Sequence, residues 1–262
     1  MDRQNQAKMA QPKLADLMTR FLNQQAQDRQ AGLPEMPVGE VELHEAAFAP
    51  QVEPRTAWEE ANAALRMLVP QSESALKSVP PGWANLVQHP ASVPAVAFAA
   101  GNYPQLIRDL PELIRTKPRA SLLHADNNYD VTGFDSWTAR AVEKKNFVAA
   151  FMGAGILRLA GRFDAARKIL ADLRAQIPAE CKQALANEEA VLAWQSGQHE
   201  QAYESWKKLP DSAPVCFNRG MAALFLDRAD EAKGHLKQTI GLLPEDNAWH
   251  QLARLYLALT EI

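Results

Sequence analysis

The residues of this chain whose types could act together chemically lie between His124 and Asp130. His124, Asp126 and Asp130 share one polar stretch, and a histidine beside two carboxylates can transfer protons or bind a metal ion. Asp126 also starts a run with oxygen ligands at alternate positions, as calcium-binding loops do. The sixth position of such a loop should be Gly and is Val131, and the twelfth should be Glu and is Trp137. We therefore interpret this stretch as a solvated turn without bound metal.

Other patterns that carry chemistry are missing from the sequence. The six histidines include no i, i+4 pair, and with the two cysteines they give no zinc-ligand spacing. Gly153 and Gly155 lack the third glycine and the preceding strand of a phosphate-binding loop, so close helix–helix approach explains them better. Cys181 and Cys216 are expected to be buried, reduced thiols. These observations predict a protein that is not an enzyme and that has no cofactor and no metal site.

Composition limits the expected partners and compartment. The formal net charge is −3 and no cluster of Lys and Arg stands out, so a nucleic-acid partner is not expected. The longest apolar stretch, Val148 to Leu157, is too short to span a bilayer, and a membrane partner is not expected either. The N-terminus has no apolar run of the kind found in secretory signals. The sequence therefore predicts a cytoplasmic protein.

One spacing recurs three times in the second half of the chain: a turn residue, an Ala five positions later and a Pro seventeen positions later. The sets are Gly161/Ala166/Pro178, Gly197/Ala202/Pro214 and Asp227/Ala232/Pro244. Recurrence at this period indicates stacked helix pairs. In the last unit, Phe217, Met221 and Leu224 form a helical stripe, and a second helix from about Ala229 to Leu243 is predicted to follow the turn.

These positions resemble the tetratricopeptide repeat (TPR) family, whose 34-residue frame has small, apolar and Pro residues at fixed places. The matching residues are Ala154, Leu157, Ala166, Leu170 and Pro178 in the first unit, Ala190, Ala193, Ala202 and Trp206 in the second, and Gly220, Ala223, Ala232, Leu236 and Pro244 in the third. The resemblance covers roughly residues 146–262 and implies three helix pairs followed by a capping helix from Ala248 to Leu259. The Leu209-Pro210 pair predicts a shortened second helix in the second unit, with Pro214 opening the next helix.

The expected fold is therefore all-α: an α-α superhelix (a TPR-like solenoid) with an irregular helical N-terminal half. Residues 1–54 are assigned an amphipathic helix on Leu14 to Leu22 and a Pro/Glu-rich connector. Residues 55–140 are assigned a helical region with a degenerate TPR-like unit at about 94–118 and a polar loop at 120–136. In that unit the first helix is expected from about Pro94, and Pro111 is expected to kink or break the second. A long helix is expected from about Trp137, and residues 141–262 hold the repeats.

The resemblance also implies that the first helix of each unit lines a concave face. The residues expected near this face are Phe151, Gly155, Arg158, Asn187, Val191, Trp194, Phe217, Met221, Leu224, Gln251 and Leu255. A solvated apolar lining of this size would be a liability, so a partner or the chain's own N-terminal half should cover it. Relatives in this family that bind a C-terminal carboxylate use five polar residues, of which only Asn218 has a match here. We therefore expect no carboxylate clamp and a local hydrogen bond for Asn218.

Three functions stay open at this point. The first is a non-enzymatic interaction module or scaffold that binds a peptide or helix of a protein partner in the apolar concave groove. The second is a small-molecule-binding or enzymatic protein with its site near His124, Asp126 and Asp130. The third is a self-associating structural protein whose groove is covered by its own N-terminal half, with the Leu14 to Leu22 helix as the contact in a homo-oligomer.

Overall fold

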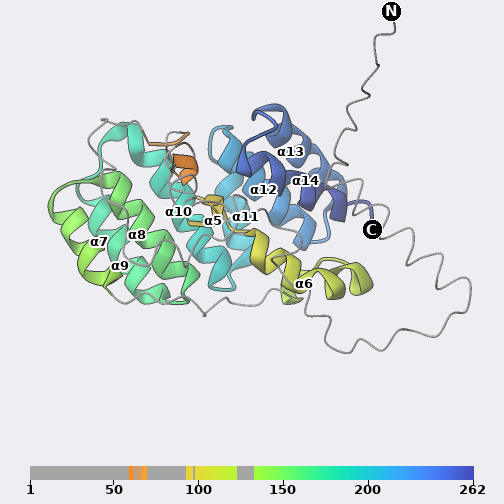
Figure 1. Cartoon of the computed structure of the whole chain (residues 1–262), viewed down its shortest axis with the longest axis horizontal. Coiled ribbons are helices and arrows are strands. Elements are labelled where there is room, and N and C mark those ends of the chain that lie inside the picture. Colours follow the sequence, from red (N-terminus) through yellow and green to blue (C-terminus); the bar gives the residue numbers. More distant parts are fainter. Residues whose placement is uncertain are drawn as a thin grey trace, which may run out of the picture. The chain divides into compact units, whose positions relative to one another are not determined.

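From Phe134 onward the chain forms consecutive helices joined by short turns (Figure 1). The computed structural model describes residues 59–61, 63, 65, 67–69, 93–96, 98–122 and 133–262. All of these residues belong to one compact unit, Glu45–Ile262. Within the described ranges the fold is all-α, without strands. The helix expected on Leu14 to Leu22 and the connector up to residue 54 lie outside them.

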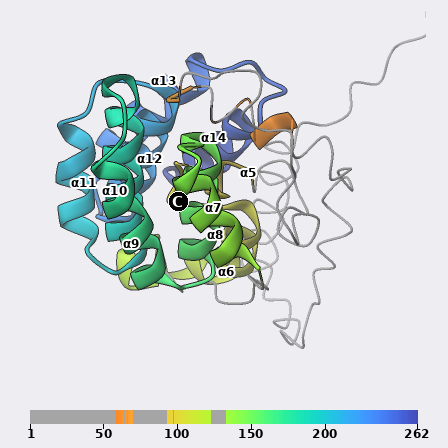
Figure 2. The same ribbon diagram turned by 90° about the vertical axis from the view of Figure 1, so that its left-hand side faces the viewer.

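The helices of the second half are arranged as three antiparallel pairs and a final helix, as the sequence predicts. The pairs are α8 (Phe147–Leu159) with α9 (Phe163–Arg174), α10 (Lys182–Gln195) with α11 (His199–Lys207), and α12 (Ala213–Phe225) with α13 (Ala229–Gly241); α14 (Ala248–Leu259) comes last. The second helix of each pair also packs against the first helix of the next element, which links the pairs in a row (Figure 2). This confirms the all-helical repeat arrangement.

The recurring turn residues are explained by backbone conformation. Gly161, Gly197 and Asp227 have φ values of 71°, 85° and 62°, in the left-handed region that favours Gly and tolerates Asp. Each of them ends the first helix of a pair and lets the chain reverse. The recurring Ala is buried where the two helices meet, with Ala202 fully buried. In the last pair, a Cβ on Gly220 would lie 2.6 Å from Leu236 Cγ, so Gly permits the close approach of α13.

The shortened helix of the second pair is also confirmed. Helix α11 ends at Lys207, and Pro214 lies in the first turn of α12. Arg219 stabilises the early end of α11 because its guanidinium donates to two carbonyl oxygens there. Arg219 Nε donates to the Trp206 carbonyl at 3.0 Å, and Nη2 donates to the Leu209 carbonyl. A buried cation is favourable at this position because carbonyl groups concentrate there.

The segment before the repeats differs from expectation in its boundaries. The predicted long helix from Trp137 is two helices, since α7 (Phe134–Glu143) begins three residues earlier and ends before Lys145, which has a φ of 53°. Asn146 then caps α8 by accepting a hydrogen bond from the Ala149 N–H at 3.1 Å. The predicted loop at 120–136 is partly helical, with a 3₁₀ turn at Ala120–Leu122 and the start of α7. His124, Asp126 and Asp130 lie outside the described residues.

The predicted degenerate unit at about 94–118 is not a helix pair. Its first helix, α5 (Val93–Val96), is a single turn. Phe98 then has a φ of 70°, a value that a right-handed helix cannot contain. Its second helix, α6 (Tyr103–Thr116), is uninterrupted, so of the predicted kink or break at Pro111 the break is wrong. Pro111 is exposed, and solvent can therefore bond to the carbonyl that the missing N–H leaves free. Residues 98–102, which precede α6, are not helical.

The hydrogen bond that joins α11 to α13 gives a pH-dependent prediction. The Tyr203 hydroxyl donates to Glu231 Oε2 at 2.6 Å, and burial, followed by this bond, raises the pKa of Tyr203 to about 12. The pKa is higher in the folded than in the unfolded chain, so the contribution is complete below pH 10 and lost between about pH 10 and 12. Wild type should therefore exceed Tyr203→Phe in urea-unfolding free energy at pH 8, and the difference should shrink by pH 11.5. A difference that stays constant over this range would contradict the assignment.

Candidate functional site

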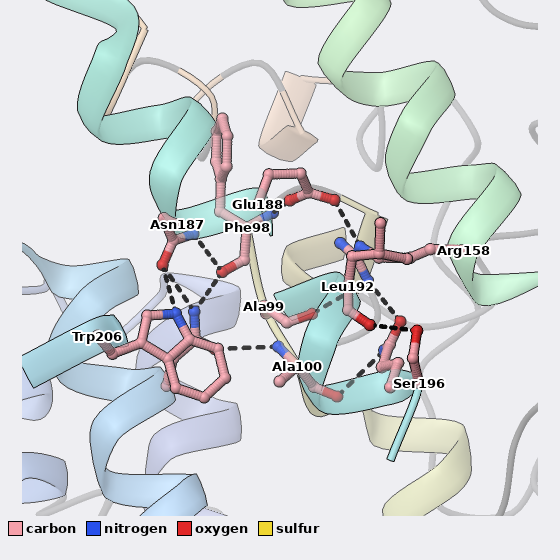
Figure 3. A network of polar contacts seen from close by, with 11 residues as sticks. Phe98, Ala99, Ala100, Arg158, Asn187, Glu188, Leu192, Ser196 and Trp206 are labelled. Carbon is pink, nitrogen blue, oxygen red and sulfur yellow. Dashed lines mark hydrogen bonds and ion pairs between the residues drawn. The ribbon is translucent and has the colours of Figure 1, made fainter. Parts of the chain in front are cut away.

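Residues 98–102, here named the inserted segment, lie against the first helices of the three pairs. The segment leads into α6, and the side chains that hydrogen-bond to its backbone at residues 98–100 come from α8, α10 and α12 (Figure 3). Phe98 and Ala99 are fully buried, and Ala100 is 4% exposed. The chain thus places a non-helical stretch of its own backbone on the face that the sequence predicts to be concave.

Phe98 is held at both of its backbone polar groups. Its carbonyl accepts hydrogen bonds from Asn187 Nδ2 at 3.0 Å and from Asn218 Nδ2 at 2.6 Å. Its N–H donates to Glu188 Oε2 at 3.0 Å. The prediction that Asn218 bonds locally is therefore wrong, because its partner is 120 residues away in the sequence.

Ala99 and Ala100 are held in the same way. The Ala99 carbonyl accepts from Arg158 Nη1 at 3.3 Å, and the Ala100 carbonyl accepts from Gln195 Nε2 at 3.3 Å. The Ala100 N–H donates to Asn218 Oδ1 at 2.9 Å. Side chains from three successive helix pairs therefore bind the segment through its backbone, which is a contact that does not depend on the segment's own side chains.

A buried ion pair supplies two of these contacts. Arg158 Nε lies 2.5 Å from Glu188 Oε1, and the two side chains are 0% and 1% exposed. Removing both charges from water is costly, and the cost is offset only when the remaining hydrogen-bonding groups are matched. The inserted segment provides that match, because Glu188 also accepts from Phe98 and Arg158 also donates to Ala99. Arg158 Nη2 has no hydrogen-bond partner among the described residues.

The orientation of the two asparagine amides is fixed by a third donor. Trp206 Nε1 donates to Asn187 Oδ1 at 3.1 Å, and Asn218 Nδ2 donates to the same oxygen at 3.0 Å. With its oxygen facing these donors, Asn187 must present its NH₂ group to the Phe98 carbonyl. The fully buried Trp206 ring therefore positions the groups that hold the segment.

Shape as well as polarity fits the segment to the helices. A Cβ on Gly155 would lie 1.7 Å from the Val96 carbonyl oxygen, so only Gly lets α8 approach the end of α5. The rings of Phe98 and Phe151 pack with centroids 5.5 Å apart. A Cβ on Gly101 would lie 2.3 Å from Tyr256 Oη. Of the two glycines attributed to helix–helix approach, Gly153 does face a helix, through Thr138 of α7, whereas Gly155 faces the backbone of α5.

The remaining residues predicted for the concave face have several different environments. Phe217 packs against Trp249 and Tyr256, with ring centroids at 5.4 and 5.6 Å. Gln251 is partly exposed and donates to the Glu245 carbonyl. The other members are almost fully buried and do not form an open apolar surface: Val191, Trp194, Met221, Leu224 and Leu255.

Sequence analysis missed Glu188, Gln195 and the role of Asn218. A signal for the ion pair was present, because Arg158 is the single charged residue of α8, whose other residues are all apolar or Gly. A cation in so apolar a helix requires a buried acid nearby. Nothing comparable marks Gln195, whose contact is with the backbone of a distant segment.

A cavity of about 170 Å³ lies beside the C-terminal part of the inserted segment. It is lined by Ala100, Gly101, Asn102, Gln105, Arg158, Leu159, Phe163, Trp194, Gln195, Gly197, His199, Met221 and Tyr256. The Trp194 and His199 rings meet there edge to face, with centroids 4.6 Å apart. Burial lowers the pKa of His199 below its usual value, which favours the uncharged ring.

Among the described residues there is no group of three or more His, Cys, Asp or Glu side chains that could hold a metal ion. The helices in the same part of the chain include none that is both long and apolar enough to cross a membrane.

The described residues thus define an all-α arrangement of stacked helix pairs whose first helices hold a non-helical segment of the same chain. No protein-family model matches this chain, and no curated protein or solved structure is significantly similar to it.

Proposed function

We propose that this chain is a non-enzymatic protein-interaction module, built like the tetratricopeptide-repeat proteins, whose groove binds an extended segment of a partner protein. In this proposal the groove consists of α8, α10 and α12, and the inserted segment occupies it until the partner's segment takes its place. Support comes above all from the contacts of Arg158, Asn187, Glu188, Gln195 and Asn218 with five backbone groups of residues 98–100.

The choice of polar side chains supports binding of backbone rather than simple core formation. A segment that served only to fill the groove could be held by apolar contacts at lower desolvation cost. Here two charges and three amides point at peptide groups, and they would be left unmatched on an apolar floor if no backbone were present. Such a groove must be filled by an extended chain, and any extended chain of suitable side chains can satisfy it.

Competition between the two segments follows from their connectivity. A segment tethered at both ends has an effective concentration on the order of millimolar or above. A partner must therefore present its segment at high local concentration or bind more tightly than residues 98–102. This arrangement keeps the apolar groove covered in the absence of a partner.

The test is binding of a fluorescein-labelled peptide of residues 94–103 to the full-length chain carrying Phe98→Glu. Phe98 is fully buried against Phe151, so a carboxylate there should expel the inserted segment and open the groove. We expect fluorescence anisotropy to show binding at least tenfold tighter than to wild type. Adding Asn218→Leu to the same variant should abolish this gain, because Asn218 bonds two backbone groups of the peptide.

Circular dichroism and light scattering complete the experiment. Retained helix content without peptide binding would contradict the proposed function. Dimers of the wild-type chain that dissociate in Phe98→Glu would instead indicate that two copies exchange their segments, in favour of the self-associating alternative.

A further inference from the structure

The inserted segment leaves unfilled the cavity of about 170 Å³ that adjoins it. This space is partly open to solvent, and its volume is close to the roughly 150 Å³ that holds a benzene-sized ring, so it has room for a leucine side chain. The segment contributes only Ala100, Gly101 and Asn102 to its wall. Since Asn102 uses its side-chain oxygen to cap α6, the two small residues determine how much of the cavity the chain itself fills.

The three neighbouring positions of the segment differ in the side chains they could accept. Ala99 is fully buried and does not line the cavity. Gly101 lines it, but a Cβ there would lie 2.3 Å from Tyr256 Oη. Ala100 lines the cavity and already carries a Cβ. Position 100 is therefore where a longer side chain could enter.

The Arg158–Glu188 pair leaves no net charge beside the cavity, which disfavours a charged side chain there, although Arg158 Nη2 has no hydrogen-bond partner among the described residues. Arg158 is neutralised by Glu188 at 2.5 Å. Both polar atoms of the Gln195 amide are already hydrogen-bonded: its oxygen accepts from Arg158 Nη1, and its nitrogen donates to the Ala100 carbonyl. His199 is packed against Trp194, and burial lowers its pKa. Met221 and Trp194 are among the other lining residues, and an uncharged side chain loses less on leaving water than a charged one.

We propose that the partner's segment has the pattern aromatic, small, leucine-sized apolar, glycine at the positions of Phe98, Ala99, Ala100 and Gly101, and that its third side chain fills this cavity. This inference rests on the proposed function and specifies its partner. The chain's own segment is then the weaker ligand of the groove, because Ala100 leaves the cavity empty. A partner with this pattern can displace it in spite of the tether.

The experiment uses the wild-type full-length chain and three peptides of residues 94–103: the parent sequence, one with Ala100→Leu and one with Ala99→Leu. Hydrogen–deuterium exchange of the segment is the readout, because the Phe98 and Ala100 N–H groups are bonded to Glu188 and Asn218 and become exposed on displacement. The Ala100→Leu peptide should reach half-maximal exchange at about one tenth of the parent concentration. The Ala99→Leu peptide should produce none, because that site has no free space.

The same substitutions in the full-length chain give a readout independent of partner binding. Ala100→Leu should raise the melting temperature, since it fills the cavity, and the matched Ala99→Leu should lower it. Equal potency of the parent and Ala100→Leu peptides, or a lower melting temperature for the Ala100→Leu chain, would overturn the inference while leaving the proposed function standing. Failure of all three peptides to displace the segment at millimolar concentration would overturn the proposed function, and the partner pattern with it.

Discussion

Glu188→Ala should lower the free energy of unfolding by about 3–5 kcal/mol, because it leaves the Arg158 guanidinium buried without a counter-charge. Arg158 and Glu188 are 0% and 1% exposed, and their 2.5 Å contact has no access to solvent. The substitution also removes the acceptor of the Phe98 N–H, so the inserted segment should exchange its amide protons faster. Urea unfolding followed by circular dichroism measures the first effect, and hydrogen–deuterium exchange measures the second.

The neighbouring residue provides a matched control. Glu189 lies on the same helix and pairs with Arg174 at 2.6 Å, but their side chains are 30% and 69% exposed. Glu189→Ala should cost less than about 1 kcal/mol, as exposed ion pairs do. Equal losses for Glu188→Ala and Glu189→Ala would refute the burial of the first pair. The double variant Arg158→Met with Glu188→Leu should recover much of the stability, since apolar residues of similar size remove the unpaired charge.

The second large effect is expected for Gly155→Ala. The new Cβ would lie 1.7 Å from the Val96 carbonyl oxygen, a backbone atom at the end of α5 that cannot rotate aside. We expect the free energy of unfolding to fall by about 3 kcal/mol, which is at the upper end of the range for overpacked cores. The inserted segment should also be released from the groove. Thermal unfolding and hydrogen exchange of residues 98–102 would report these two results.

Gly234→Ala is the control for Gly155→Ala. Gly234 lies inside α13, and a Cβ there would meet no atom within 4 Å. This substitution should stabilise the chain by about 0.5–1 kcal/mol, because Ala loses less backbone entropy in a helix than Gly. If Gly155→Ala changed the stability as little as Gly234→Ala, then α8 would not approach α5 as closely as described.

The helix pairs were predictable because local rules determine them. The turn residues Gly161, Gly197 and Asp227 require positive φ, and apolar stripes at helical spacing define the faces that must be buried. The early end of α11 followed from Leu209-Pro210, since Pro cannot continue a helix. Each of these signals acts over a few residues, which is the range over which a single sequence is informative.

The contacts of the inserted segment could not be predicted in the same way. Asn218 and Phe98 are separated by 120 residues, and no local pattern states which backbone an amide will meet. The segment itself has a helix-compatible composition, Phe98-Ala99-Ala100, and it is the groove that holds Phe98 at a φ of 70°. Tertiary contacts therefore override propensity here. Expectations about the Leu14 to Leu22 helix and about His124, Asp126 and Asp130 stay predictions.

The long-range contacts of the inserted segment also affect how the chain unfolds. In a simple repeat array each unit contacts only its neighbours, so units can unfold one after another from an end. Here one short stretch bonds to all three helix pairs across sequence separations of 59 to 120 residues. When the segment detaches, every helix pair loses a contact at the same time. The segment can form these contacts only after large loops close, which slows folding. The array should consequently behave as one cooperative unit that folds more slowly than its local helix contacts would suggest.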